Sequence, residues 1–395
     1  MKILFFTQYY EPEPFLIHDK TKELVNNGNE VTVVTGLPNY PKGEVMKDYK
    51  PGKQIIDGVN IVRLPIRPRK TGSKNLFLNY ISYVIQGNKF VKSLDANFDV
   101  VYVYQLSPVF MAIPGIKYKK KFKKNLIIYC LDLWPESLVS GGIKKDRFIY
   151  NVFKIISKRI YKQADSIHIS SRQFPKYFNE VLNVKKKFIY NPQYAVETSA
   201  TIMEKSPYDD KKINITFTGN VGEMQSLDTV VNAMSIIESD NVQLNIVGDG
   251  SQLENLKSLV KDLDITEKVI FHGRKPVEQM DSYLHYSDAL IISMKDDEAI
   301  SYTMPAKLQS YLKSGKFIIG TINGEAARVI QEANVGIVSN AGNIEQLARN
   351  IELFMKKKDD FILNGKNGKK YYYEKFGKDK FIKILIEDLK RLSNS

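Results

Sequence analysis

The sequence is poor in cysteine and in long apolar runs. Its single cysteine, Cys130, excludes an intramolecular disulfide and a cysteine-rich zinc site, and its apolar neighbours predict a place in the core. A reducing cytosol fits this cysteine usage. No run of about 18 apolar residues occurs, so any membrane contact is expected to be peripheral. The apolar N-terminus reaches Glu11 too early for a spanning helix and shows no small-residue cleavage site, so we expect it to be a buried strand.

Length and charge narrow the class of protein further. A chain of 395 residues with 43% hydrophobic residues predicts two domains with substantial cores. The formal net charge of +14 favours an anionic partner, which is nucleic acid, an acidic membrane surface or a phosphorylated substrate. No recognised nucleic-acid motif is present, so we expect no nucleic acid partner.

Short apolar runs alternate with helical patterns along the whole chain, as in parallel sheets whose strands are joined by helices. Expected strands of the first half are residues 3–7, 31–35, 100–104, 126–131 and 166–170, and those of the second half are 213–219, 242–247, 269–271, 289–293, 317–320 and 336–338. This predicts an α/β protein with two doubly wound, Rossmann-like domains facing across a cleft at the carboxyl ends of their strands. We place the domains at 1–195 and 205–375, followed by a C-terminal helix at 376–395 that can cross back to the first domain.

The stretch 213–228, INITFTGNVGEMQSLD, combines an expected strand, a turn with Gly219 and Gly222, and the start of a helix. The glycines let a ligand approach the main chain closely, and Ser226 or Asp228 can cap the helix that begins near Leu227. A helix start offers free N–H groups to an anion, so we interpret the stretch as a phosphate cradle. The alternative is an ordinary strand-to-helix loop.

Other turns of the second half place polar groups beside this one. The candidates are Gly248, Arg274, Lys275, Pro305, Ala306, Lys307 and Glu325. The cations can face a diphosphate, amides of the helix that follows Pro305 can bind an anion, and Glu325 can accept hydrogen bonds from sugar hydroxyls. The alternatives are plain turns, a solvated Arg-Lys pair and a carboxylate that stabilises a helix terminus. The acidic run 296–298 is interpreted as a solvated turn, because consecutive side chains point apart, and no metal site is expected.

The first half offers acidic groups at two strand ends. His18 and Asp19 follow the first expected strand and can act as a proton acceptor and its orienting neighbour, or Asp19 can be a helix N-cap. Asp132 follows strand 126–131 and precedes Trp134, the only tryptophan. The carboxyl group of Asp132 can meet a ligand, while Trp134 can equally be a core residue.

Basic residues gather twice in the first half. One group is Arg67, Arg69, Lys70 and Lys74; the other, which we call the lysine cluster, is Lys117, Lys119, Lys120, Lys121, Lys123 and Lys124. Tyr118 and Phe122 interleave the lysine cluster, and aromatic with basic residues suit an interface with anionic lipid. A solvated helix face is the alternative.

Taken in order, the motifs resemble those of family-4 retaining glycosyltransferases with the GT-B fold, and more closely a bacterial branch that builds capsule and O-antigen repeats and includes N-acetyl-L-fucosamine transferases. The resemblance rests on PEPFLIHD, TGLPNYPKG, DLWPES, FTGNVGEMQSLD, GDGS, FHGRKP, TMPAKLQSYL and GEAA. It implies transfer of a sugar from UDP to a polyprenyl-diphosphate-linked acceptor. It also implies that no metal or other cofactor is needed, because main-chain amides, helix N-termini and basic side chains neutralise the leaving diphosphate.

The chain departs from the wider family at several positions. Asn220 and Gln225 stand where many members carry arginine and lysine, and Tyr302 and Ser310 stand where many carry paired glutamates. We therefore expect Asn220 and Gln225 to hold the donor with Gly219 and Gly222, while Lys307 and Arg274 supply the positive charge. In the first loop, Leu16 and His18 replace the usual arginine and asparagine of the branch, so the acceptor and the role of His18 differ from the pattern.

The sequence therefore predicts a cytoplasmic transferase, peripheral on the inner face of the plasma membrane, that adds a UDP-activated amino sugar to a lipid-linked saccharide. Asp19, Asp132 and His18 are the predicted catalytic residues. Competing interpretations are a UDP-sugar epimerase of the same fold and a non-catalytic protein that binds sugar nucleotides or membranes.

Overall fold

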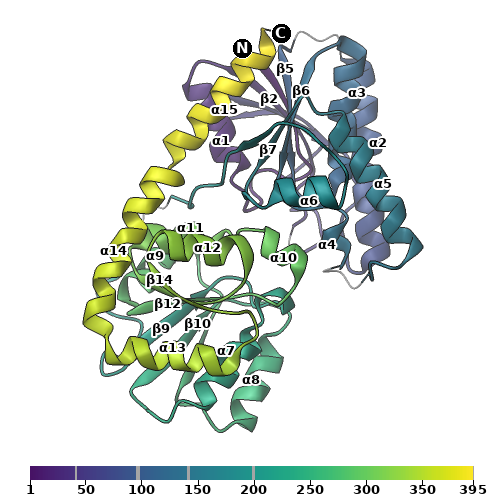
Figure 1. The fold of residues 1–395 in the computed structure, drawn as a ribbon. Coiled ribbons are helices and arrows are strands. Elements are labelled where there is room, and N and C mark those ends of the chain that lie inside the picture. Colours follow the sequence, from purple (N-terminus) through teal and green to yellow (C-terminus); the bar gives the residue numbers. More distant parts are fainter. Residues whose placement is uncertain (41, 95–97, 140–142, 198–200, 395) are drawn as a thin grey trace. The chain divides into compact units, whose positions relative to one another are not determined.

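The computed structural model describes residues 1–40, 42–94, 98–139, 143–197 and 201–394, and it consists of two compact units (Figure 1). The first unit contains Met1–Pro192 and Phe381–Ser395, and the second contains Gln193–Lys380. Pro41 of the motif TGLPNYPKG and residues 198–200 of the predicted interdomain stretch lie outside the described residues.

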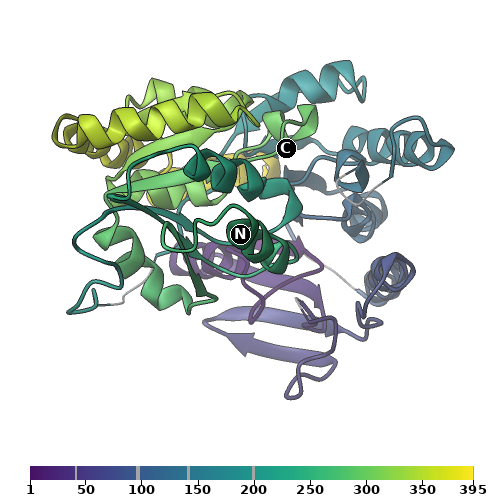
Figure 2. The same cartoon turned by 90° about the horizontal axis from the view of Figure 1, so that it is seen from below.

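The first unit is built on a sheet with the strand order β3-β4-β2-β1-β5-β6-β7-β8. Its strands are β1 (Lys2–Phe6), β2 (Glu30–Gly36), β3 (Gly52–Ile56), β4 (Val59–Leu64), β5 (Val100–Gln105), β6 (Asn125–Cys130), β7 (Ser166–Ile169) and β8 (Phe188–Tyr190). All pair in parallel except β3, which pairs antiparallel with β4 at the sheet edge (Figure 2). Asp57 and Gly58 join β3 to β4 with φ of 49° and 76°, as a two-residue hairpin turn requires.

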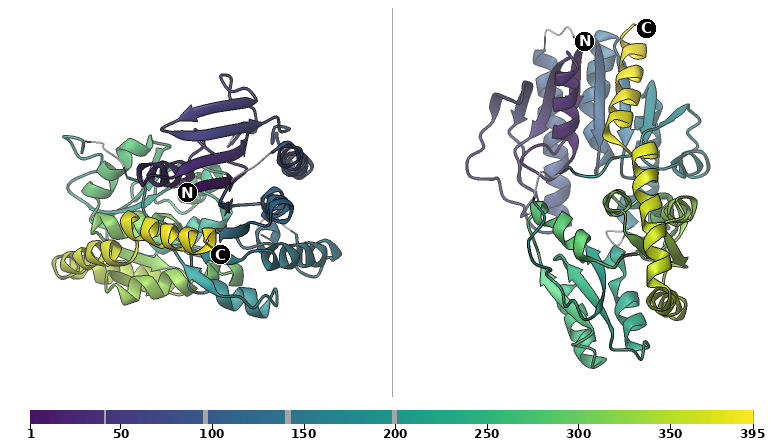
Figure 3. Two further views of the ribbon diagram at one scale, coloured as in Figure 1. Left: turned by 90° about the horizontal axis from the view of Figure 1, so that it is seen from above. Right: turned by 90° about the vertical axis from the view of Figure 1, so that its left-hand side faces the viewer.

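Helices cover both faces of this sheet. They are α1 (Ile17–Asn26), α2 (Ser73–Ser93), the 3₁₀ turn η1 (Val109–Ala112), α3 (Ile113–Phe122), α4 (Glu136–Val139), α5 (Phe148–Lys162), α6 (Phe174–Glu180) and α15 (Lys378–Ser393). Figure 1 shows α2, α3 and α5 together on one face, and Figure 3 shows α1 and the part of α15 that belongs to this unit on the other. Cys130 is fully buried, as predicted.

Helix α15 is held on the first unit by buried polar contacts. His168 Nε2 of β7 lies 2.8 Å from Asp388 Oδ2, and both side chains are buried. Burial alone raises the pKa of Asp388, but hydrogen bonds from His168 and Ser166 outweigh it and hold the pKa at about 2. Lys20 Nζ of α1 lies 4.7 Å from the centre of the Phe381 ring. The last turns of the chain therefore complete the unit in which the chain begins.

The second unit has an all-parallel sheet with the order β11-β10-β9-β12-β13-β14. Its strands are β9 (Ile213–Thr218), β10 (Val242–Val247), β11 (Val269–Gly273), β12 (Ala289–Ser293), β13 (Phe317–Thr321) and β14 (Gly336–Ser339). The longer helices are α7 (Leu227–Ser235), α8 (Leu253–Asp262), α9 (Met280–Tyr286), α11 (Lys307–Ser314), α12 (Gly324–Glu332), α13 (Ile344–Lys356) and α14 (Lys358–Lys375); η2 (Glu223–Gln225), η3 (Val277–Gln279) and α10 (Glu298–Tyr302) are short.

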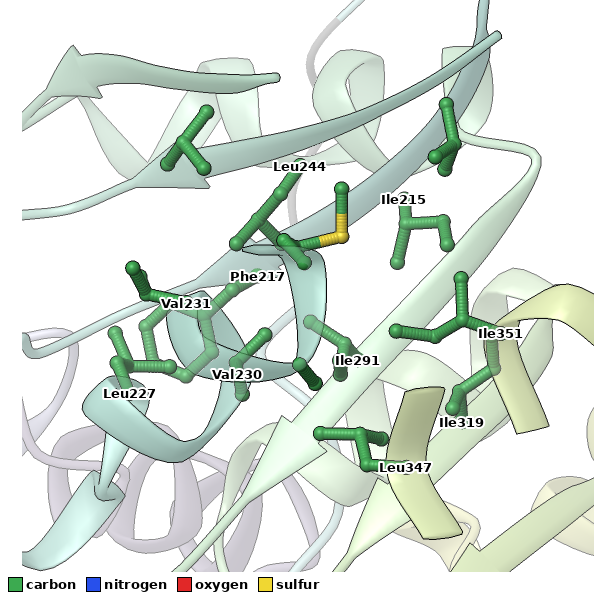
Figure 4. Packing of buried hydrophobic residues seen from close by; sticks show 14 of the residues in the cluster. Ile215, Phe217, Leu227, Val230, Val231, Leu244, Ile291, Ile319, Leu347 and Ile351 are labelled. Atoms are coloured by element: carbon green, nitrogen blue, oxygen red, sulfur yellow. The ribbon is translucent and has the colours of Figure 1, made fainter. Parts of the chain in front are cut away.

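The side chains of β9 alternate between the two faces of this sheet, and both faces bury side chains of this strand. Ile215 and Phe217 pack with side chains of α7 and α13, including Val230 and Ile351 (Figure 4). Thr216, on the opposite face, is also fully buried. A strand buried on both faces is expected at the centre of a parallel sheet. The carboxyl end of β9 is therefore the middle of the edge at which such sheets bind ligands.

The predicted α/β organisation is confirmed, because the strands of both sheets, apart from the edge strand β3, are parallel and helices pack against them. Every predicted strand is present, with bounds that differ by two residues or fewer. Strands β3, β4 and β8 were missed. The Asp57-Gly58 dipeptide between alternating apolar residues is the signal that predicts the β3–β4 hairpin.

Candidate functional site

Two turns at the carboxyl edge of the second sheet pack against each other through their main chains. The N–H of Gly219, just after β9, donates to Val247 O at 2.9 Å, and the N–H of Val221 donates to Asp249 O at 2.9 Å. A Cβ on Gly248 would lie 1.8 Å from Gly219 O, and one on Gly250 would lie 2.3 Å from Val221 O. Such contacts exclude any side chain at positions 248 and 250. The two predicted glycine turns are therefore a single structural unit.

Neutral side chains brace the first of these turns. Gln225 Oε1 accepts a hydrogen bond from the Gly222 N–H at 3.1 Å and another from Asn220 Nδ2 at 3.1 Å. Both donors belong to the segment that the sequence predicts as a phosphate cradle. Asn220 and Gln225 thus shape the turn, and the positive charge of a cradle has to come from elsewhere.

Replacing Gln225 with leucine is expected to weaken UDP binding about five- to tenfold, because the turn loses both hydrogen bonds at nearly unchanged side-chain volume. Isothermal titration calorimetry measures the effect. Gln331→Leu is the matched control, since Gln331 is an exposed residue of α12. Equal UDP affinities for the wild type and the Gln225 variant would contradict the bracing role.

The predicted cap of the following helix is wrong. Helix α7 begins at Leu227, as expected, but Ser226 has φ of 42° and makes no capping hydrogen bond to the helix. The Ser226 hydroxyl instead lies 3.1 Å from Asp228 Oδ1 and 3.1 Å from Thr229 Oγ1. The short turn η2 comes between the glycines and α7, so the chain bends twice before the helix starts. The prediction assumed that the helix follows directly on the glycine turn, so it did not include this bend.

Lys307 lies beneath the Gly219 turn. The residue as a whole is partly exposed, but its Nζ is buried and makes no hydrogen bond in the described structure. The Nζ lies 3.5 Å from the centre of the Phe217 ring. A Cβ placed on Gly219 would be 3.5 Å from this Nζ. Burial lowers the pKa of Lys307 from 10.5 to about 7. A buried ammonium without an anion is unfavourable, and a bound anion at Gly219 would relieve that cost.

Tyr311 fixes Lys307 in place, and the sequence analysis did not single it out. The two residues are four apart on α11 and therefore share a helix face. The hydroxyl of Tyr311 accepts a hydrogen bond from the Thr218 N–H at 2.9 Å. This bond ties α11 to the last residue of β9. In the sequence, the signal for this pair is a lysine and a tyrosine four residues apart, shortly after a proline, at the start of a helix.

The other predicted donor residues are spread along the same edge. Arg274 and Lys275 follow β11, and in the described residues neither forms an ion pair. Pro305 and Ala306 precede α11, whose N-cap Ala306 offers no side-chain hydrogen bond.

Glu325 has a partner within its own helix. It is fully buried in the first turn of α12, and its two carboxylate oxygens accept hydrogen bonds from Arg328 at 2.8 and 3.1 Å. The carboxylate is therefore bound within α12. This arrangement agrees with the alternative in which Glu325 stabilises the terminus of its own helix. Contact between Glu325 and a sugar stays a prediction.

In the first unit, Asp132 lies at the carboxyl end of β6. Its Oδ2 accepts a hydrogen bond from the Ser107 N–H at 2.8 Å, and Trp134 Nε1 donates to Ser107 Oγ at 2.9 Å. Burial raises the pKa of Asp132, although the bonds from Ser107 act in the opposite direction. The side chain is nevertheless partly exposed. A positioned carboxyl group with a raised pKa is suited to accept a proton from a bound hydroxyl.

His18 and Asp19 have different surroundings from Asp132. His18 Nδ1 lies 3.0 Å from Tyr10 Oη, and its Nε2 lies 3.0 Å from Asp57 Oδ2 in the β3–β4 turn. Both ring nitrogens therefore have protein partners. Asp19 is not the N-cap, because α1 starts at Ile17 and Asp19 lies inside its first turn. Catalytic roles for His18 and Asp19 stay predictions.

Only one of the two aromatic residues in the lysine-cluster prediction is partly exposed, namely Phe122. Tyr118 is fully buried and packs against Phe122. Three cluster lysines bond within the fold: Lys117 Nζ to Asn88 O, Lys121 Nζ to Lys92 O, and Lys119 Nζ to the Asp165 carboxylate. Tyr118 is therefore excluded from membrane contact, whereas the lysines and Phe122 are not.

No group of three His, Cys, Asp or Glu residues stands in an arrangement that could hold a metal ion, as far as the described residues go. No helix in the same residues combines the length and the apolar character needed to cross a bilayer.

Comparisons with known proteins agree with this geometry. Residues 198–392 match the family described as Glycosyl transferases group 1. The probable glycosyltransferase WbjE of Pseudomonas aeruginosa is 23% identical over 57% of this chain and 58% of its own length. The putative colanic acid biosynthesis glycosyl transferase WcaI of Escherichia coli K12 is 21% identical over 80% of this chain and 82% of its own.

A solved structure shares the fold over the whole chain. The structure of Anabaena HepE in complex with UDP-glucose has a TM-score of 0.71 at 13% identity, over 99% of this chain and all of that one. Residues 198–392 therefore match the group 1 glycosyltransferases, and the chain as a whole has the GT-B fold.

Proposed function

We propose that the protein is a retaining glycosyltransferase that moves an amino sugar, of the N-acetyl-L-fucosamine type, from a UDP-sugar to a polyprenyl-diphosphate-linked saccharide. It would act in capsule or O-antigen synthesis, at the cytoplasmic face of the plasma membrane. Two relatives support this context: WcaI is named for colanic acid biosynthesis, and HepE was solved with UDP-glucose.

The observation that carries the proposal is the buried, unpartnered Nζ of Lys307 under the Gly219 turn. A diphosphate on this turn would meet main-chain N–H groups and one ammonium. The leaving UDP carries more negative charge on its diphosphate than the bound donor does, so these groups stabilise the transition state more than the ground state. Arg274 and Lys275 would add charge from the neighbouring turn. Binding of this kind needs no metal.

On the acceptor side, Asp132 would bind the attacking hydroxyl and hold it for loss of its proton. The donor-edge groups described above are cations and neutral amides, apart from Glu325, whose carboxylate is bound by Arg328. We therefore infer attack on the same face from which UDP leaves, with the diphosphate accepting the proton. This route retains the configuration at the anomeric carbon.

A panel of UDP-sugars, incubated with and without a lipid-linked saccharide, tests the proposed function. Acceptor-dependent UDP release and a product of retained anomeric configuration by NMR are the expected results. Conversion of the UDP-sugar without an acceptor would identify an epimerase instead, and binding without any conversion would identify a non-catalytic protein. Either result would overturn the proposal.

A further inference from the structure

Exposed apolar side chains of the first unit are concentrated on two neighbouring helices. Of the six large apolar residues exposed in its described part, five lie on α2 and α5. They are Phe77 (44% exposed), Ile85 (48%), Phe148 (83%), Ile149 (45%) and Ile155 (51%). Apolar residues gathered in this way on a protein surface mark a binding site more often than chance.

A cavity opens between the same two helices. It has a volume of about 430 Å³, and its apolar lining includes Phe77, Tyr80, Trp134, Leu138, Ile149 and Phe153. We call it the α2–α5 pocket. Its volume is in the range of pockets that hold small molecules, whereas a partner helix would need a long open groove. The limited volume and the apolar lining therefore favour an apolar chain as the occupant.

The surroundings of the pocket are basic. Neither α2 nor α5 contains an acidic residue. Lys74 lines the pocket, and Arg67 and Lys70 lie before α2. The segment before α5 contains Lys144, Lys145 and Arg147 and a single acidic residue, Asp146. Basic residues around an apolar cavity are complementary to an amphiphile with an anionic head group.

Ser107 connects the lining of the pocket to Asp132. Ser107 lines the pocket, and its N–H donates to Asp132 Oδ2 at 2.8 Å. Trp134, another lining residue, donates to Ser107 Oγ. A molecule that fills the pocket therefore contacts Ser107, which is bonded to the carboxylate that we assign to the acceptor hydroxyl.

We propose that the α2–α5 pocket receives the apolar chain of a lipid phosphate, which is the lipid part of the acceptor. The basic residues at its rim hold the phosphate groups. This proposal rests on the proposed function, and it assigns lipid binding to α2 and α5 in place of the lysine cluster. It explains why Phe77 and Ile149 remain exposed in a protein with a large apolar core.

Trp134 provides a direct readout, because it is the only tryptophan and lines the pocket. We expect geranylgeranyl diphosphate to change its fluorescence saturably, and inorganic diphosphate to leave it unchanged. In the double variant Phe77→Ser, Ile149→Ser, the lipid should bind at least about tenfold more weakly, since two apolar contacts are lost. Ile55→Ser is the matched control, because Ile55 is 71% exposed on β3 and does not line the pocket.

A second variant tests the rim without touching apolar packing. Lys74 is exposed, so Lys74→Glu is expected to fold normally. It should weaken the diphosphate lipid several-fold and leave geranylgeraniol, which has no charge, unaffected. Circular dichroism checks the fold of both variants.

Equal lipid binding by the wild type and the double variant would overturn the proposal. So would a Trp134 response to vesicles of anionic phospholipid or to an acidic amphipathic peptide in the absence of any response to geranylgeranyl diphosphate. UDP binding, measured in the same samples, separates this proposal from the function itself. If the lipid changes the fluorescence of Trp134 but no sugar is transferred, the proposal for the pocket is supported and the proposed transferase function is contradicted.

Discussion

Replacing Lys307 with methionine is expected to reduce UDP affinity about 100-fold and to make the protein more stable. Methionine keeps the length and apolar stem of lysine but removes the buried charge. A charge-assisted contact with a phosphate contributes about 2–3 kcal/mol, which is the source of the expected loss of affinity. Turnover should fall by a factor of about 10² to 10³, because the same charge stabilises the leaving diphosphate.

The gain in stability has a defined dependence on pH. In the folded protein burial lowers the pKa of Lys307 from 10.5 to about 7. Between these values the unfolded chain binds more protons than the folded one, so stability rises with pH across this window. The cost of the buried lysine is therefore fully present below about pH 7 and disappears as pH approaches 10.5. The variant should exceed the wild type by a few kcal/mol at pH 7 and by much less at pH 10.

Chemical denaturation at several pH values and UDP titration measure the two effects. Lys316→Met is the matched control: burial also lowers the pKa of Lys316, but this lysine lies just before β13, at the opposite end of the strand from the candidate site. The control should bind UDP normally. A Lys307 variant with normal UDP affinity would remove this residue from the donor site, and a destabilised one would show that its amine is favourably placed without a ligand.

Replacing Asp132 with asparagine is expected to lower turnover about 10²- to 10⁴-fold, while UDP affinity stays within about twofold of the wild type. Asparagine can still accept the Ser107 N–H bond, so the local geometry is kept. It lacks the negative charge that binds the acceptor hydroxyl and prepares it to lose its proton to the diphosphate. Because burial raises the pKa of Asp132, wild-type turnover should begin to fall at a pH above the usual range of an aspartate as the solution is acidified.

Steady-state UDP release at saturating donor is the measurement for Asp132. Asp262→Asn is the control, since Asp262 is exposed in the last turn of α8. The raised pKa also means that ionised Asp132 lowers stability at neutral pH, so the variant should be slightly more stable than the wild type. Unchanged turnover in the Asp132 variant would exclude its proposed role with the acceptor.

The fold was predictable because its signals are local. Apolar runs such as 213–218 and 289–293, and the turns that follow them, identify parallel strands without any knowledge of their neighbours. The strand order, however, depends on pairings between residues far apart. Asp388 and His168 are 220 residues apart, and no local pattern links them. Contacts of this kind decide which unit the last helix completes.

The candidate site was predictable in part. Gly219, Gly248 and Lys307 were singled out from turn chemistry and helix starts, and the structure brings them together. What the sequence could not show is burial: nothing in the letters PAK indicates that the Lys307 Nζ is enclosed against Phe217. The same applies to Tyr118, whose position in a basic segment suggests a surface residue although the ring is buried.

Both groups assigned to chemistry are unfavourable for folding. The amine of Lys307 lacks an anionic partner, and the carboxyl group of Asp132 has a raised pKa. Such a cost in stability is expected where a protein positions an ionisable group to interact with a ligand. The α2–α5 pocket has a comparable cost, because the apolar side chains of Phe77 and Ile149 are exposed to water until the proposed lipid covers them.

The central claim is that Lys307 takes up a proton when a diphosphate binds at the Gly219 turn. Calorimetry of UDP binding at pH 8, in two buffers of different ionisation enthalpy, measures this directly, since phosphate groups with a pKa near 6 are already ionised there. The account predicts uptake approaching one proton per UDP in the wild type and almost none in the Lys307→Met variant. Equal proton uptake by the two proteins would contradict it.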